Sequence, residues 1–313
     1  MKLLMNYIFS NIIGSFIVDD KGKIIDEILF NNVQEFQNKE KTENKLSKKH
    51  QAKLLPQEDW HLALKNFRDP KYFHKFYERN LELTKQAVKD SVGDDLLIMQ
   101  TISNFVELDR TANLLTKRLR EWYSLYLPEL SEKISSHEMY VDFVEKKSKK
   151  ELLKELKISA TMGADLEATH VEEIILLAKQ IKELNKLKEQ HEVYLEKIMK
   201  KCCPNLLELA GTTIGAKLVE LGRGLKHLAM LPASTIQLLG AEKALFRHIK
   251  TGSRSPKYGV IFQHPLIQNA PRKIRGKVSR VLADKLSLCV RLDFFKGEFK
   301  AKEYRKKLEE KFQ

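Results

Sequence analysis

A row of cationic side chains is the feature of this sequence that is best able to do chemistry. Lys243, Arg247 and Lys250 stand at positions i, i+4 and i+7, so a helix running from Ser234 to about Lys250 would place them on one face. Such a row can follow the phosphates of a nucleic acid, because ammonium and guanidinium groups donate charge-assisted hydrogen bonds to phosphate oxygens. Charged residues at this spacing are as often a solvated helix face. The spacing alone therefore leaves nucleic-acid contact and plain solvent exposure equally open.

The distribution of charge along the chain favours a polyanionic partner. Lysine and arginine number 33 against 33 aspartate and glutamate over residues 1–200, and 23 against 9 over residues 201–313. The whole net charge of +14 therefore belongs to the last third of the chain. A protein that is basic for reasons of salt or heat would carry its excess evenly. An excess confined to one foldable segment indicates a polyanion, most commonly a nucleic acid.

Residues for catalysis or metal binding do not occur in a productive pattern. The chain has three cysteines, Cys202, Cys203 and Cys289. They are too few for a disulfide framework and lack the spacing of a zinc site. This cysteine content fits a reducing, intracellular compartment. The histidines of the last third are on no recognised ligand spacing: His227, His248 and His264. No nucleophile stands in a pattern with a base. The sequence therefore predicts a non-catalytic protein with no metal site and no cofactor of its own.

The elements that must hold the cationic helix divide the chain into three predicted parts. Residues 1–92 are predicted to form a small α/β domain, with one strand over the first 17 residues, a turn at 18–23 and a second strand at Ile24–Phe30. Polar residues interrupt the apolar N-terminal run, so it resembles a signal peptide only superficially. Residues 93–202 are predicted to be a helical hairpin, and residues 203–313 a domain of short helices. No stretch is long and apolar enough to predict a membrane span.

The hairpin is predicted from apolar residues that recur every seven positions in two long helices. In the first helix the two interleaved sets are Ile98, Phe105, Ala112, Leu119 and Tyr126, and Thr101, Leu108, Leu115 and Trp122. In the second they are Ile174, Ile181, Lys188 and Leu195, and Leu177, Leu184, His191 and Ile198. One antiparallel hairpin buries a single stripe of each helix, so we expect a homodimer that pairs through these seams. The alternative is a hairpin that packs only on its own chain.

Four ordered motifs resemble the Nop domain, the signature of the core scaffold proteins of box C/D ribonucleoproteins and of a spliceosomal relative. They are GADLEATHVEEI at 163–174, PASTIQLLGAEKALFRHIKTG at 232–252, PKYGVIFQHPLIQ at 256–268 and PRKIRGKVSRVLADKLSLCVRLDFF at 271–295. The resemblance implies a mainly α protein with a small α/β N-terminal domain, a long antiparallel coiled-coil hairpin and a Nop domain dominated by α-helices. The short chain and the lack of a lysine/glutamate-rich tail resemble the single archaeal member, so an archaeal cytoplasm is expected, or the nucleolus if the protein is eukaryotic.

The resemblance also implies partners. The N-terminal domain is expected to bind fibrillarin, the methyltransferase, whose S-adenosylmethionine cofactor belongs to that partner. The Nop domain is expected to bind a box C/D guide RNA once a kink-turn-binding ribosomal-protein relative has folded it, for 2′-O-methylation of rRNA or tRNA. The expected RNA-binding residues are Gln237, Gly240, Ala241, Glu242, Lys243, Ala244, Leu245, Phe246, Arg247, Lys250, Arg254 and Lys257. The alternative is a spliceosomal-type protein that bridges a small nuclear RNA particle without a methyltransferase.

Overall fold

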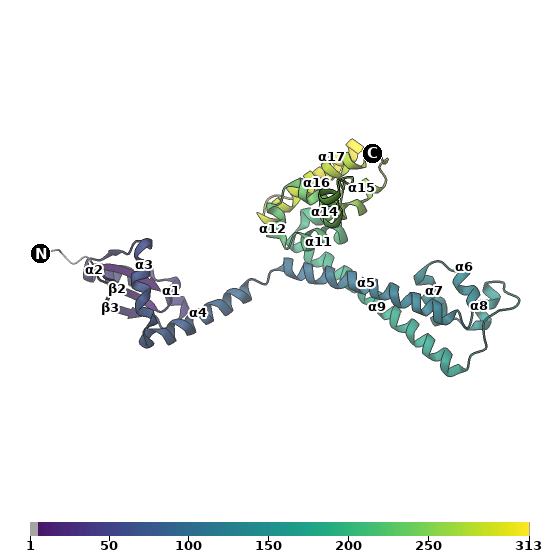
Figure 1. The fold of residues 1–313 in the computed structure, drawn as a ribbon, viewed down its shortest axis with the longest axis horizontal. Helices are drawn as coiled ribbons and strands as arrows, with labels where there is room; N and C mark the ends of the chain where they lie inside the picture. Colours follow the sequence, from purple (N-terminus) through teal and green to yellow (C-terminus); the bar gives the residue numbers. More distant parts are fainter. Residues whose placement is uncertain (1–5, 313) are drawn as a thin grey trace. The chain divides into compact units, whose positions relative to one another are not determined.

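The computed structural model describes residues 6–312, and its chain is mainly helical with one small sheet near the N terminus (Figure 1). The predicted fold class is thereby confirmed. The chain divides into two compact units, one ending at Val92 and the other beginning at Gly93.

A four-stranded sheet in the order β3-β2-β1-β4 forms the centre of the N-terminal unit. The strands are β1 (Tyr7–Asn11), β2 (Gly14–Val18), β3 (Ile24–Leu29) and β4 (Lys53–Leu54). The single strand predicted before residue 18 is wrong within the described residues, because β1 and β2 form an antiparallel hairpin. Asn11 makes the turn by accepting a hydrogen bond from the Ile13 amide at 3.0 Å. Position 14 requires a glycine because a Cβ there would lie 2.5 Å from the Ile28 carbonyl oxygen. Residues 1–5 of the predicted strand lie outside the described part.

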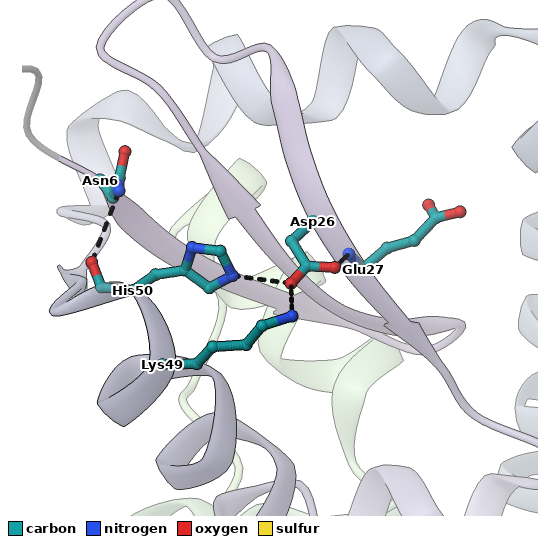
Figure 2. Close-up of polar contacts among 5 residues, drawn as sticks. All are labelled: Asn6, Asp26, Glu27, Lys49 and His50. Carbon is teal, nitrogen blue, oxygen red and sulfur yellow. Dashed lines mark hydrogen bonds and ion pairs between the residues drawn. The ribbon is translucent and has the colours of Figure 1, made fainter.

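Helices complete the N-terminal unit. They are α1 (Val33–Gln37), α2 (Glu40–His50), η1 (Gln57–Asp59), α3 (Trp60–Leu64), η2 (Lys65–Arg68) and α4 (Pro70–Asp90). The end of α2 is fastened to β3 by Asp26, whose carboxylate lies 2.8 Å from Lys49 Nζ and 2.7 Å from His50 Nε2 (Figure 2). Hydrogen bonds from these two side chains lower the pKa of Asp26 to about 2. The carboxylate therefore stays ionised and keeps its two partners at neutral pH.

Two long helices, α5 (Asp94–Tyr123) and α9 (Ala168–Cys202), pack side by side as the predicted hairpin (Figure 1). One predicted set in each helix faces the partner helix: Ile98, Ala112 and Leu119 in α5, and Ile174, Ile181 and Leu195 in α9 are buried. Phe105 is half-buried in the same line. These side chains are therefore already buried by packing within one chain.

The other set in each helix is displaced by one residue from the prediction. The buried positions are Ile102, Thr116 and Tyr123 in α5 and Ala178 and Met199 in α9. Leu108, Leu115, Leu177 and Leu184 are only half-buried beside this seam. In both helices the buried residues stand four apart, as in Ala112 and Thr116 or Ile174 and Ala178, because residues i and i+4 lie on the same face of a helix.

A helical cap closes the far end of the hairpin. It consists of α6 (Pro128–Lys133), α7 (His137–Lys146) and α8 (Lys149–Glu155), with a core of its own around Tyr123, Tyr140 and Leu152. No side chain caps the N terminus of α9. The N-cap is Glu167 without a side-chain hydrogen bond, Thr169 lies inside the helix, and Asp165 instead forms an ion pair with Lys149 at 3.1 Å.

Short helices surround one buried helix in the last part of the chain. They are α10 (Pro204–Ala210), α11 (Thr212–Leu221), α12 (Leu225–Met230), α13 (Ala233–Leu238), α14 (Glu242–Thr251), η3 (Val260–Gln263), α15 (Pro265–Gln268), α16 (Arg275–Phe294) and α17 (Ala301–Phe312). Leu282 and Leu286 of the buried helix α16 share one apolar core with Ile98 and Met199 at the base of the hairpin. The segments 93–202 and 203–313, which were predicted as separate domains, therefore share a core inside one compact unit.

Candidate nucleic-acid interface

The single helix expected from Ser234 to Lys250 is wrong, because the segment forms two helices, α13 and α14, with a break at Leu239–Ala241. Gly240 has φ +84° at the break, a backbone conformation that side chains disfavour. Its amide donates a hydrogen bond to Glu242 Oε1 at 2.7 Å. Glu242, which was expected to bind RNA, therefore has a structural contact within the chain. Neither Ser234 nor Thr235 caps α13, whose N-cap is Pro232.

The break is held by the loop that returns after α14. The Gly259 amide donates to the Gln237 carbonyl at 2.8 Å, and the Val260 amide donates to the Leu239 carbonyl at 2.7 Å. A Cβ at Gly259 would lie 1.9 Å from the Leu239 oxygen. The close backbone approach at this break thus needs a glycine at position 259, within the motif at 256–268.

The cations Lys243, Arg247 and Lys250, called the α14 row below, are all exposed on one side of α14. Glu242 and Asp284 are engaged elsewhere: Glu242 accepts a hydrogen bond from the Gly240 amide, and Asp284 pairs with Lys285 at 3.3 Å. Within residues 6–312, no ion pair joins the α14 row to an acid. The row is therefore free to meet an external anion.

The rest of α14 divides into an inner and an outer side. Ala244, Leu245 and His248 are half-buried and face the domain, so Ala244 and Leu245 lie away from the α14 row. Phe246 and Ile249 are 64% and 71% exposed on a flank of the same helix. Large apolar side chains this exposed, directly beside unpaired cations, are typical of a surface that meets another molecule.

The remaining predicted residues lie next to α14. Gln237 is half-buried and donates from Nε2 to the Lys257 carbonyl, so it supports the loop. Arg254 and Lys257 are exposed on that loop, and Lys257 lays its aliphatic stem against Gly276 at the start of α16. The structure thus brings all twelve predicted residues into one region, with Gln237, Ala244 and Leu245 in supporting positions.

Positive charge predominates in this region, with Glu242 and Asp284 as the acids at its borders. From residue 243 to residue 283 the chain has ten lysine and arginine residues and no aspartate or glutamate. Mutual repulsion of like charges destabilises a compact surface unless a polyanion neutralises it. The region is therefore suited to phosphate oxygens.

A cavity of about 730 Å³ lies at the base of the hairpin, away from the α14 row. Its carboxylates have structural partners: Asp94 pairs with Lys201 at 2.9 Å, Asp95 accepts from the Leu225 amide at 3.1 Å, and Asp293 accepts from the Leu206 amide at 2.8 Å. Burial raises the pKa of Asp293. In the described part of the chain, no three histidine, cysteine or acidic side chains are grouped as metal ligands. No helix among residues 6–312 has the length and apolar character needed to cross a membrane.

The family model described as "Nop: snoRNA binding domain, fibrillarin" matches residues 104–313, so this chain belongs to the Nop family. An uncharacterized NOP5 family protein of Methanocaldococcus jannaschii is 41% identical over 251 residues, which are 75% of this chain and 60% of that protein. Nucleolar protein 56 of Schizosaccharomyces pombe is 35% identical over 68% of this chain and 47% of its own length. Nucleolar protein 58 of Saccharomyces cerevisiae is 37% identical over 64% of this chain and 42% of its own length.

The chain thus spans 60%, 47% and 42% of the lengths of these three relatives. Among solved structures, a chain of the crystal structure of a fibrillarin/Nop5p complex has a TM-score of 0.46 and 23% identity, over 95% of this chain and 97% of that one.

Proposed function

We propose that this protein is a non-catalytic, RNA-binding scaffold of a box C/D ribonucleoprotein. It holds guide RNA with its Nop domain and positions the methyltransferase fibrillarin for 2′-O-methylation of rRNA or tRNA. The observation that carries the proposal is the exposed, unpaired α14 row inside the segment that matches the snoRNA-binding family model. The chain supplies geometry, because a linkage of fixed length raises the effective concentration of what it joins.

The RNA surface is proposed to be a composite of RNA and protein. The α14 row suits phosphates, which position the RNA without reading its sequence. Phe246 and Ile249 beside the row cannot hydrogen-bond to phosphates, but they can pack against the apolar surface of a protein already bound to the RNA. A kink-turn-binding protein that folds the guide RNA first would present both surfaces together.

Self-association is proposed for the outer side of the hairpin. The inner seam is filled within one chain, yet Leu114, Trp122, Leu176 and Val193 remain 59%, 42%, 50% and 69% exposed on the two long helices. Half-buried Leu115 and Leu184 lie at the edge of the seam. A second copy would cover these side chains by a four-helix arrangement, which is a common way to bury a second stripe of a hairpin.

The N-terminal unit is proposed to bind fibrillarin. The family model whose description names fibrillarin matches residues 104–313, outside this unit, so the proposal rests on the charge and the surface of the unit itself. Residues 1–92 have 16 lysine and arginine against 13 aspartate and glutamate, so they add little to RNA affinity. On α4, Phe73, Tyr77, Leu81 and Val88 are all exposed and recur along one side of the helix. This apolar stripe suits a protein partner rather than a polyanion.

Reconstitution tests the scaffold proposal. Full-length protein, the kink-turn protein, guide RNA and fibrillarin with S-adenosylmethionine are expected to methylate a target RNA at the 2′ position, and omission of the chain is expected to abolish the reaction. Methylation that is equally fast without the chain would refute the scaffold role. In a pull-down, retention of fibrillarin supports the box C/D function. Its loss, with RNA binding intact, favours the spliceosomal-type alternative.

A further inference from the structure

A second row of cations lies at the start of α16, outside the residues assigned above to RNA. Lys273, Lys277 and Arg280, called the α16 row below, repeat the i, i+4, i+7 spacing of the α14 row. Lys273 stands in the turn that leads into the helix, where the Ile274 and Arg275 amides both donate to the Pro271 carbonyl and continue the helical path. All three side chains are exposed. Across residues 6–312, none of the three forms an ion pair.

The α16 row is joined to the α14 side of the domain through Lys257. The stem of Lys257 lies against Gly276, where a Cβ would be 3.4 Å from its Cδ. Arg280 lines a groove of about 480 Å³ together with Gln237, and Gln237 in turn donates to the Lys257 carbonyl. The loop at Lys257 therefore links α13, which directly precedes α14 in the chain, to the start of α16.

A neighbouring arginine shows that exposure of the α16 row is not the general condition of cations here. Arg275 donates from Nε to the Ala270 carbonyl at 2.9 Å and from Nη2 to the Gln268 carbonyl at 2.8 Å, and its guanidinium lies 5.7 Å from the Phe262 ring. It braces the turn before α16. The three cations of the α16 row make no such contact, and Asp284, the carboxylate that shares the groove with Arg280, pairs with Lys285 at 3.3 Å.

We propose that the α16 row binds a second run of RNA phosphates, separate from the run held by the α14 row. The proposal rests on the proposed function, because it takes RNA as the partner. Both rows act through charge, so the second row strengthens binding and orients the RNA without choosing its sequence. RNA held along two rows is fixed in direction, whereas one row leaves it free to pivot.

The test measures RNA affinity against salt for full-length protein. The probe is a box C/D guide RNA already bound by the kink-turn protein. The variant is Lys273→Ala/Lys277→Ala/Arg280→Ala. The matched control, Lys75→Ala/Lys85→Ala/Lys89→Ala, removes the same charge from exposed positions of α4 in the N-terminal unit. Wild type loses affinity as salt rises from about 50 to 200 mM, with each phosphate contact adding roughly 0.7–0.9 to the log–log slope. Over the same salt range, the fold-loss of affinity is expected to be about 20 to 40 times smaller for the α16 variant than for wild type. The control variant is expected to show the same fold-loss as wild type.

A parallel variant of the α14 row separates the two proposals. If Lys243→Ala/Arg247→Ala/Lys250→Ala flattens the salt dependence and the α16 variant does not, the α16 proposal is overturned and the scaffold function stands. If wild type does not bind the RNA complex, the scaffold function itself fails. If the α16 variant weakens binding to the kink-turn protein without RNA, the row docks protein and the proposal is again overturned. The single variant Lys277→Gln, with a lowering of the slope by about one contact expected, guards against misfolding of the triple variant.

Discussion

Replacement of Arg247 by alanine tests the assignment of the α14 row most directly. The guanidinium is exposed, and within residues 6–312 it has no ion pair, so its removal breaks no contact of the folded chain that the structure describes. A bidentate, charge-assisted contact to phosphate contributes about 1–3 kcal/mol. Arg247→Ala is therefore expected to weaken binding to the RNA–kink-turn protein complex about 5- to 150-fold. The log–log salt slope is expected to fall by about 0.9.

The stability of the variant separates a contact from a structural brace. Exposed substitutions without partners change the free energy of unfolding by about 0.5 kcal/mol or less, which is about 2 °C in Tm for a unit of this size. RNA affinity by fluorescence anisotropy and Tm by calorimetry are measured on the same preparation. Arg110→Ala, an exposed arginine on α5, removes the same charge and is expected to bind RNA normally. An unchanged affinity for Arg247→Ala, or a loss that follows only the loss of Tm, would refute the assignment.

Four further expectations concern the other parts of the chain. Leu115→Asp/Leu184→Asp is expected to give monomers by light scattering, because each change puts an unpaired charge at the hairpin edge; an unchanged mass would rule out dimerisation there. A chain that begins at residue 93 is expected to keep RNA binding and lose fibrillarin in a pull-down, and retention of fibrillarin would move the docking surface out of the N-terminal unit. Gly259→Ala is expected to lower the free energy of unfolding by about 1–3 kcal/mol through overpacking, because its Cβ would lie 1.9 Å from the Leu239 oxygen. Tm and RNA affinity should then fall together, and a wild-type Tm would contradict this. The pKa of Asp26 falls from 3.8 unfolded to about 2 folded, so its stabilisation is present above pH 4 and is lost as pH falls toward 2; Asp26→Asn is expected to lower the Tm of the N-terminal unit at pH 7 but not at pH 2, and equal Tm values at pH 7 would contradict the bond network.

The large features of the fold could be predicted from the sequence because they depend on periodicity. The sevenfold recurrence through Ile98, Ala112 and Leu119 identified the hairpin and one of its two seam positions correctly. The other position was predicted one residue away, because the buried residues stand four apart, as in Ala112 and Thr116, where the heptad pattern placed them three apart at Leu115. Periodicity indicates which face is apolar, but the packing of the partner helix decides which residues along that face are enclosed.

Details of the α13–α14 region depended on contacts between residues distant in sequence. The helical pattern from Ser234 to Lys250 has no proline, so nothing local except Gly240 marked the break between α13 and α14. The break is made by the returning amides of Gly259 and Val260, which replace the helical bonds of Gln237 and Leu239. Lys243, Arg247 and Lys250 lie on one side of α14 as their spacing predicted, because exposed charges follow helical spacing and need no tertiary partner.

The shared core at the base of the hairpin has a mechanical consequence. Ile98 of α5 and Met199 of α9 are packed into the same apolar core as Leu282 of α16, so the hairpin cannot swivel there without exposing that core to water. Helix α9 has 35 residues and is about 50 Å long. In a dimer joined through the hairpins, the distance between the two RNA-binding domains would thus be fixed by rigid helices rather than by a flexible linker. A guide RNA with two binding sites must match that span, and an insertion of whole heptads into both long helices is expected to shift the preferred separation of those sites in step.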